Sequence, residues 1–281
     1  MVKIITDSTT DLTAQIKDSV ITVPLTVRFG DTEYADGITI TKNEFYERLI
    51  ESDTLPTTSQ PTPDLFTQQF EKIKASGDTA VVITVSSKLS GTYQSAMIAA
   101  SDYEDRIFVV DSKSVAIGTA ILTEYALSLV KSGMSASEIY DALIQKRDEV
   151  CVIGMLDTLE YLKKGGRISS AVAFAGGLLM IKPVICLDDG EIKMLGKARG
   201  SKQANNLLAQ EIQNSGGVNF DMPILTGFTG LSDILLKKYI SDSEDIWMPA
   251  GQPPRYVQIG SVIGTHAGPG AIAVAFFKNN K

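Results

Sequence analysis

A group of hydroxyl residues lies where a predicted strand meets a predicted helix. Residues 80–85 form a short apolar, β-branched run, which is typical of a buried parallel strand. Residues 93–100 have helical spacing, so Ser90 is predicted to be the N-cap of a helix. Hydroxyls and free N–H groups at such a point attract anions. From these residues alone, anion binding and simple helix capping both remain open as the role of Ser90.

Two other predicted strands also end in polar side chains. Asp7 and Ser8 follow the first strand, and Asp111 and Ser112 follow residues 107–110. The carboxyl ends of parallel strands share one edge of a sheet, where ligands of open α/β proteins bind. We therefore expect a cluster of hydroxyls at that edge. The alternative for Asp7 and Ser8 is that they only cap the helix expected after them.

The only histidine, His266, lies in residues 264–270, which contain three glycines and a proline. Such a loop can bring backbone close to a ligand, so a functional and a structural role both stay open. Cys151 and Cys186 lie in apolar runs and match no metal-binding spacing. We expect them to be buried thiols in a reducing compartment. With one histidine and no cysteine pair, the sequence predicts no metal site.

The size and charge of the chain exclude several classes of function. Its 281 residues suit two domains, 1–150 and 151–281, with the boundary expected near Val150. The 26 Lys and Arg residues against 33 Asp and Glu residues give a net charge of −7. That charge is unfavourable for binding nucleic acid or for static attachment to an anionic membrane. With no signal-peptide pattern and no apolar run of about 18 residues, a cytoplasmic protein is expected.

The order of the predicted elements is that of an α/β protein. Strands or extended segments are predicted at 2–6, 20–29, 33–40, 80–85, 107–110, 151–156, 183–187, 192–195, 223–227, 256–263 and 271–277. Helices are predicted from Thr41, from Asp64, and at 90–100, 116–130, 137–147, 159–164, 200–214 and 231–240. Hairpin turns are predicted at 30–31 and 188–190. The Ala- and Gly-rich residues 169–179 either pack closely or leave room for a ligand.

Six motifs, taken in order, resemble those of the DegV family, whose better-understood members bind fatty acids. They are DSTTD at 7–11, TSQPTP at 58–63, SSKLSGTYQSA at 86–96, LEYLKKGGRIS at 159–169, KARG at 197–200 and IGTHAGPGA at 263–271. Each motif is weak alone, but together they span nearly the whole chain. The resemblance implies an α/β fold of two domains. The N-terminal domain would hold a parallel sheet flanked by helices, the C-terminal domain a second sheet with helices, and the ligand would lie between them.

The resemblance also implies the role of a fatty-acid-binding subunit of bacterial fatty acid kinase, which is not itself an enzyme. A long-chain fatty acid would have its carboxylate at Thr58, Ser90 and His266 and its tail in an apolar tunnel. A separate kinase subunit would use ATP to form the acyl phosphate for phospholipid synthesis, and Arg199 would help that subunit engage. No cofactor other than the bound lipid, and at most transient membrane contact, is implied. The tunnel-lining candidates are Ala173, Phe174, Gly177, Leu178 and Ile181.

Two other classes of function remain as alternatives. One is a serine hydrolase or acyltransferase that uses Ser90 and His266, although the chain has no G-x-S-x-G elbow and no acid assigned to orient the histidine. The other is a binder of a small phosphorylated ligand, although the chain lacks G-x-x-x-x-G-K-[ST] and G-x-G-x-x-G. Retention of an apolar ligand through purification would exclude the second alternative as the main role.

Overall fold

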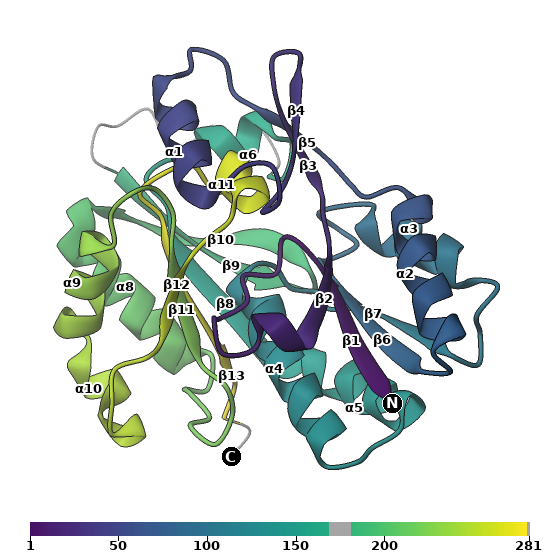
Figure 1. Ribbon diagram of the computed structural model, residues 1–281. Coiled ribbons are helices and arrows are strands. Elements are labelled where there is room, and N and C mark those ends of the chain that lie inside the picture. The colour runs from purple at the N-terminus through teal and green to yellow at the C-terminus, as the bar shows by residue number, and fades with distance from the viewer. Residues whose placement is uncertain (169–180, 280–281) are drawn as a thin grey trace.

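Two main β-sheets organise the chain, and the first is completed before the second begins (Figure 1). The computed structural model describes residues 1–168 and 181–279. The strands are β1 Val2–Asp7, β2 Val20–Val23, β3 Thr26–Phe29, β4 Thr32–Ala35, β5 Thr57–Ser59, β6 Thr79–Thr84, β7 Ile107–Asp111, β8 Val150–Met155, β9 Ile181–Asp188, β10 Glu191–Arg199, β11 Leu225–Phe228, β12 Tyr256–Gln258 and β13 Ile272–Phe277. The helices are α1 Lys42–Glu51, α2 Pro63–Ala75, α3 Thr92–Ala100, α4 Ile117–Lys131, α5 Ala136–Lys146, α6 Glu160–Lys164, α8 Gly200–Asn214, α9 Ile234–Asp242, α10 Glu244–Trp247 and α11 Ser261–Ala267.

The first sheet has the order β2-β1-β6-β7, and all of its neighbouring strands are parallel. Alternate residues of β6 point to opposite faces, as the period of two requires. Val82 packs against α2 and α3, whereas Val81 and Ile83 pack against α4 and α5. Helices on both faces explain why the strand is an uninterrupted apolar run. The predicted α/β class with a parallel, helix-flanked sheet is confirmed.

A small three-stranded sheet of order β4-β3-β5 lies beside the first sheet. Its β3–β4 hairpin turns at residues 30–31, as predicted, with Gly30 at a φ of 56°. Helix α1 follows, and Thr41 and Glu44 form a capping box at its start. Buried Phe45 and Tyr46 of α1 pack against this sheet and against α11.

The second sheet has the order β10-β9-β8-β13-β11-β12 and is antiparallel except between β11 and β12. Its outer face is covered by α8, α9 and α10 (Figure 1). Its inner face packs against α4, because Val152, Ala275 and Phe277 share one apolar cluster with α4 and the first sheet. The second sheet starts at Val150, but α4 belongs to the cores of both halves. The division into domains 1–150 and 151–281 therefore stays a prediction.

Two local predictions were wrong, and one alternative is excluded. Ser90 is not the N-cap of α3, since that place is taken by Gly91, although Ser90 Oγ accepts a weak hydrogen bond from the Thr92 N–H at 3.4 Å. Asp7 caps no helix, because its carboxylate accepts the N–H groups of Thr9 and Val85 instead. The strand predicted at 256–263 ends at residue 258, and α11 follows.

The short helix α11 owes its form to tertiary packing. The apolar, β-branched residues that precede the histidine suggest a strand by propensity alone. In the fold, a β-carbon at Gly264 would stand 2.6 Å from Tyr46 Oη, so this glycine lets α11 pack closely on α1. His266 consequently lies in the last turn of a helix and not in a glycine loop.

Candidate ligand-binding site

A cavity of about 430 Å³ lies between the carboxyl edge of the first sheet and the inner face of the second. This size is within the usual range for small-molecule sites. Its described lining residues are mostly aliphatic, and they come from both sheets, the β5 segment, α6 and α11. They include Thr9, Leu25, Thr58, Gln60, Val85, Leu89, Ser90, Val115, Ala116, Ile117, Val152, Leu156, Leu162, Arg167, Ile185, Cys186, Leu187, Ile192, Ile259, Val262, Ile263, His266 and Ile272.

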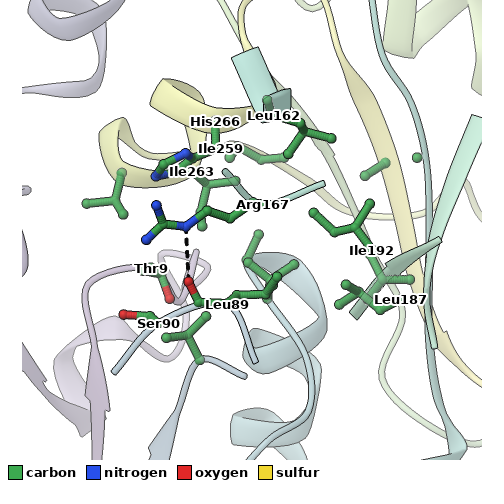
Figure 2. Close-up of a pocket in the computed structure, with 18 of the residues that line it drawn as sticks. Thr9, Leu89, Ser90, Leu162, Arg167, Leu187, Ile192, Ile259, Ile263 and His266 are labelled. Carbon is green, nitrogen blue, oxygen red and sulfur yellow. Dashed lines mark hydrogen bonds between the residues drawn. The ribbon is translucent and has the colours of Figure 1, made fainter. Parts of the chain in front are cut away.

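Several polar side chains of the lining lie together at one part of the cavity. Figure 2 shows Arg167 pointing toward the part where His266, Thr9 and Ser90 lie, while Leu187 and Ile192 lie on the opposite side of the view. The cavity therefore has a polar end and an aliphatic end. This division suits an amphipathic ligand with one small polar group.

Thr58 and His266 form the best-defined polar pair of the site. Thr58 lies on β5, opposite Val27 of β3, and its Oγ1 is 3.0 Å from His266 Nε2. The other ring nitrogen, Nδ1, is buried and has no partner among the described residues. A proton on Nδ1 would bury an unpaired donor, so we assign the proton to Nε2, which then donates to Thr58 Oγ1. The hydroxyl hydrogen of Thr58 is then available to a ligand.

The imidazole of His266 is neutral at pH 7. Burial, and second the positive charge of Arg167, lower its pKa from 6.5 to about 4. The ring also packs tightly, because a β-carbon at Gly165 would stand 2.2 Å from Nδ1. His266 therefore acts as a fixed neutral hydrogen-bonding group rather than as a charge.

Arg167 carries the only charge among the described residues that line the cavity. Its Nε donates to Leu89 O at 3.1 Å (Figure 2). Its Nη1 donates to Gly165 O at 2.6 Å. These two backbone contacts hold the half-buried guanidinium in place. A cation beside an apolar cavity whose described lining contains no carboxylate favours an anionic ligand. The sequence prediction named the motif that contains Arg167 but missed this residue; a cation directly after two glycines was the available signal.

Gln60 joins the Thr58 segment to the Ser90 segment. Its Nε2 donates to Ser95 Oγ at 2.9 Å and to Gly91 O at 3.2 Å. A β-carbon at Gly91 would stand 2.1 Å from Gln60 Oε1, so glycine at this position permits the contact. Through this contact, two motifs that lie about 30 residues apart line one cavity. Ser90 is half-buried there, with its Oγ 2.9 Å from Thr92 Oγ1.

The strand-end residues do share one edge, but most of them bind one another there. Asp7 accepts from Val85 N at 2.7 Å, and Asp111 accepts from Ser87 N at 3.1 Å. Ser86 Oγ donates to Gly190 O of the β9–β10 turn at 2.8 Å. The expected hydroxyl cluster is therefore largely structural, and of the described hydroxyl side chains in these loops only those of Thr9 and Ser90 line the cavity.

Among the described residues, side chains that the sequence did not single out line the aliphatic part of the cavity. Leu187 and Ile192 of the β9–β10 hairpin line it, although the sequence had singled out neither. Ile181 lies at the start of β9 and lines a separate recess beside α6. Four other tunnel candidates lie outside the described residues: Ala173, Phe174, Gly177 and Leu178.

Two further residues from the sequence analysis are Cys186 and Arg199. Cys186 lines the cavity and is only half-buried, whereas Cys151 is buried as expected. Burial raises the pKa of the Cys186 thiol to about 11, which disfavours a reactive thiolate. Arg199 is exposed at the junction of β10 and α8, outside the cavity, where its backbone N–H donates to Gln203 Oε1 at 3.0 Å.

The geometry gives no support to the hydrolase alternative. Ser90 Oγ contacts Thr92 and His266 Nε2 contacts Thr58, so a nucleophile–base pair is not assembled. A lone arginine in a mostly aliphatic lining is also a poor match for a multiply charged phosphate.

Within residues 1–168 and 181–279, no three His, Cys, Asp or Glu side chains are grouped to hold a metal ion. Across the same residues, no helix has the length and apolarity needed to span a membrane.

The sequence is similar to DegV family proteins over nearly its whole length. The sequence model of the DegV family, described as "Uncharacterised protein, DegV family", matches residues 1–279. A DegV domain-containing protein of Caldanaerobacter subterraneus is 34% identical over 280 residues, which cover 98% of this chain and 98% of that protein.

Solved structures share the fold over nearly the full length. A DegV family protein from Thermus thermophilus, for which fatty acid binding is described, has a TM-score of 0.86 at 31% identity, covering 98% of this chain and 99% of that one. The fatty acid kinase (Fak) B3 protein of Streptococcus pneumoniae, loaded with linoleic acid, has a TM-score of 0.86 at 23% identity, covering 99% and 100%. At this lower identity, the second likeness concerns the fold.

Proposed function

The chain belongs to the DegV family, and from that premise we propose that it binds one long-chain fatty acid in the cavity between its two sheets. The carboxylate lies at Thr58, Ser90 and Arg167, and the acyl chain lies against the aliphatic lining. The protein then presents the bound acid to a separate ATP-dependent kinase subunit, which forms the acyl phosphate. The observation that carries the proposal is the division of one cavity into a polar end with a single cation and a larger aliphatic part.

The polar end suits an ionised carboxylate. A carboxylate in apolar surroundings takes up a proton unless charges or hydrogen bonds compensate for its lost hydration. Arg167 supplies a positive charge, and Thr58, whose hydroxyl accepts from His266, supplies a hydrogen bond. The hydroxyl of Ser90 supplies a second one. His266 serves to orient Thr58, and its lowered pKa disfavours a role in proton transfer.

The aliphatic end supplies most of the affinity. A long acyl chain has about 15 methylenes, and each contributes roughly 0.8 kcal/mol when buried. The gross gain is on the order of 12 kcal/mol, before the costs of association and ordering. The tail therefore dominates binding, while the polar groups set the direction in which the acid lies.

A role in presenting substrate is supported by what the site lacks and by the place of Arg199. No nucleophile–base pair is assembled from Ser90 and His266. Arg199 is exposed and lies outside the cavity, as a contact for another protein must. The motif resemblance to fatty-acid-binding kinase subunits, and the fold shared with the Fak B3 protein, are consistent with such a partner.

Denaturing organic extraction of the purified protein, followed by mass spectrometry, tests the binding proposal. We expect a stoichiometric long-chain fatty acid. An empty extract, from a protein that also fails to bind added palmitic acid in a calorimetric titration, would refute the proposal. An extract that holds a phosphorylated metabolite in place of a lipid would favour the small-ligand alternative.

The presentation step is tested separately with Arg199→Ala in a reconstituted assay with a fatty acid kinase subunit and ATP. We expect unchanged affinity for palmitic acid but acyl-phosphate formation slowed about tenfold or more, as for loss of one charged contact. Lys202→Ala is the matched control, since Lys202 is an exposed cation in the first turn of α8. A wild-type rate in Arg199→Ala would remove Arg199 from the partner surface.

A further inference from the structure

The loop at residues 7–11 touches both walls of the polar end of the cavity. At one end of the loop, Asp7 accepts from Val85 N at 2.7 Å and from Thr9 N at 3.0 Å. Val85 and Thr9 both line the cavity, and Val85 leads into the segment that carries Ser90. At the other end, Asp11 accepts from Gly260 N at 2.8 Å, one residue before α11 begins. The loop thus connects the Ser90 side of the cavity to the helix that carries His266.

Three side chains bind the backbone of residues 258–260 directly before α11: Lys42, Tyr46 and Asp11. Asp11 also binds Lys42. Lys42 Nζ donates to Asp11 Oδ1 at 2.7 Å and also donates to Gln258 O. Tyr46 Oη donates to Ile259 O at 2.9 Å. The position and angle of α11 therefore depend on a carboxylate from the 7–11 loop and on two side chains of α1.

Asp11 is chemically unusual for a residue that only fills space. Its side chain is 2% exposed, and its Oδ2 has no hydrogen-bond partner among the described residues. Burying a carboxylate is costly, and an apolar side chain would fill the same volume without that cost. The carboxylate does, however, let Oδ1 accept hydrogen bonds from the Gly260 N–H and from Lys42 Nζ, which an apolar side chain could not do.

We propose that Asp11 is a positioning residue that fixes α11, and with it the His266–Thr58 pair, relative to the Ser90 segment. The carboxylate holds Gly260, the N-cap residue of α11, and His266 lies in the last turn of the same seven-residue helix. The ring of His266 is joined to Thr58 by one hydrogen bond between Nε2 and Oγ1. A rotation of α11 would carry the ring with it and break this bond. The effect on ligand affinity rests on the proposed function, whereas the effect on His266 does not.

The test uses the fact that the chain contains one histidine, so its imidazole resonances are unambiguous in NMR spectra. We expect the imidazole of the ligand-free wild type to titrate near its lowered pKa of about 4. In Asp11→Ala, a displaced and hydrated ring is expected to titrate about one unit or more higher, toward 6.5. Asp11→Asn keeps an oxygen acceptor for the Gly260 N–H and should restore most of the wild-type titration.

Asp78→Ala is the matched control. Asp78 is also a buried, ion-paired aspartate, bound to the N-terminal ammonium at 2.6 Å, but it lies before β6 at the opposite edge of the first sheet. We expect this variant to lose stability without any change in the His266 titration. An unchanged titration in folded Asp11→Ala would overturn the proposal, as would an equal change in Asp78→Ala.

A second measurement concerns the ligand. The ratio of the affinities for palmitic acid and methyl palmitate reports head-group recognition, and we expect Asp11→Ala to lower this ratio about tenfold. Failure of the wild type to bind either lipid would refute the proposed function but leave the titration test intact. Should Asp11→Ala not fold, the double variant Asp11→Ala/Lys42→Met is compared with Lys42→Met alone, because Lys42 also donates to Gln258 O. A His266 titration that is raised only in the double variant supports the proposal, and equal titrations of the two variants overturn it.

Discussion

Replacement of Thr58 by valine isolates one hydrogen bond of the proposed head-group site. Valine keeps a similar shape and the β-branched character that suits β5, but it removes the hydroxyl. The hydroxyl lies 3.0 Å from His266 Nε2 and would donate to the carboxylate of the ligand. The variant therefore loses a bond to the charged ligand and leaves a buried N–H of His266 without its acceptor.

The expected magnitude follows from those two losses. A hydrogen bond to a charged group contributes about 1.5–3 kcal/mol, which corresponds to about 10- to 100-fold in affinity. We expect the dissociation constant of palmitic acid to rise by that factor. Methyl palmitate, which carries no charge, should lose less than about threefold, because its affinity comes mainly from the tail.

Both lipids are to be titrated by displacement of a fluorescent fatty acid, with thermal unfolding as a check on the fold. Thr57→Val is the control, since Thr57 is the exposed neighbour on the same strand and is absent from the cavity lining. Equal weakening of the acid and the ester would show that Thr58 shapes the cavity without recognising the carboxylate. Unchanged affinity for the acid would refute the placement of the head group.

Two further predictions concern charge. Arg167→Gln should weaken palmitic acid at least about tenfold at pH 8 and less at pH 5, where the acid can bind in its protonated form; equal losses in displacement titrations at the two pH values would contradict this. Burial raises the pKa of Asp36 to about 6 from 3.8, so its contribution to stability is fully present below about pH 4 and is lost as the pH rises to about 6. Asp36→Asn should therefore be more stable than the wild type at pH 7, by up to ~3 kcal/mol, and nearly equal to it at pH 4. Urea unfolding at both pH values measures the difference, and an unchanged pH slope would contradict it.

The elements that could be predicted are those whose form depends on local sequence. The buried run of β6, the hairpin turn before Glu191 and the helix at Gly200–Asn214 all agree with the structure. In each of these elements, the conformation is determined by the spacing of apolar residues, by a glycine or by a turn residue, all within about ten residues of sequence. His266 was misplaced because α11 depends on packing against Tyr46, which is distant in sequence.

The candidate site was less accessible to local reasoning. Thr58 and His266 are 208 positions apart, and nothing local to either residue indicates that they form a hydrogen bond. The resemblance to a family led us to expect both residues near the ligand head group, but the hydrogen bond between them was not predicted. The two glycines before Arg167 were a local signal for this residue, but its proposed role also depends on the absence of any carboxylate among the described lining residues, which its own segment does not reveal. Leu187 and Ile192 line the cavity only because the β9–β10 hairpin packs beside it, and the local sequence does not predict that placement.

The place of α4 between the two sheets has a consequence for how the protein unfolds. One apolar cluster contains Val81 of the first sheet, Ile121 of α4 and Ala275 of the second sheet. Neither half can lose its packing without exposing apolar surface of the other, so a single cooperative transition is expected. A ligand held between the sheets then stabilises the whole chain at once, by about 4 kcal/mol at a thousandfold excess over its dissociation constant. Delipidation should accordingly lower one melting temperature rather than split the transition into two.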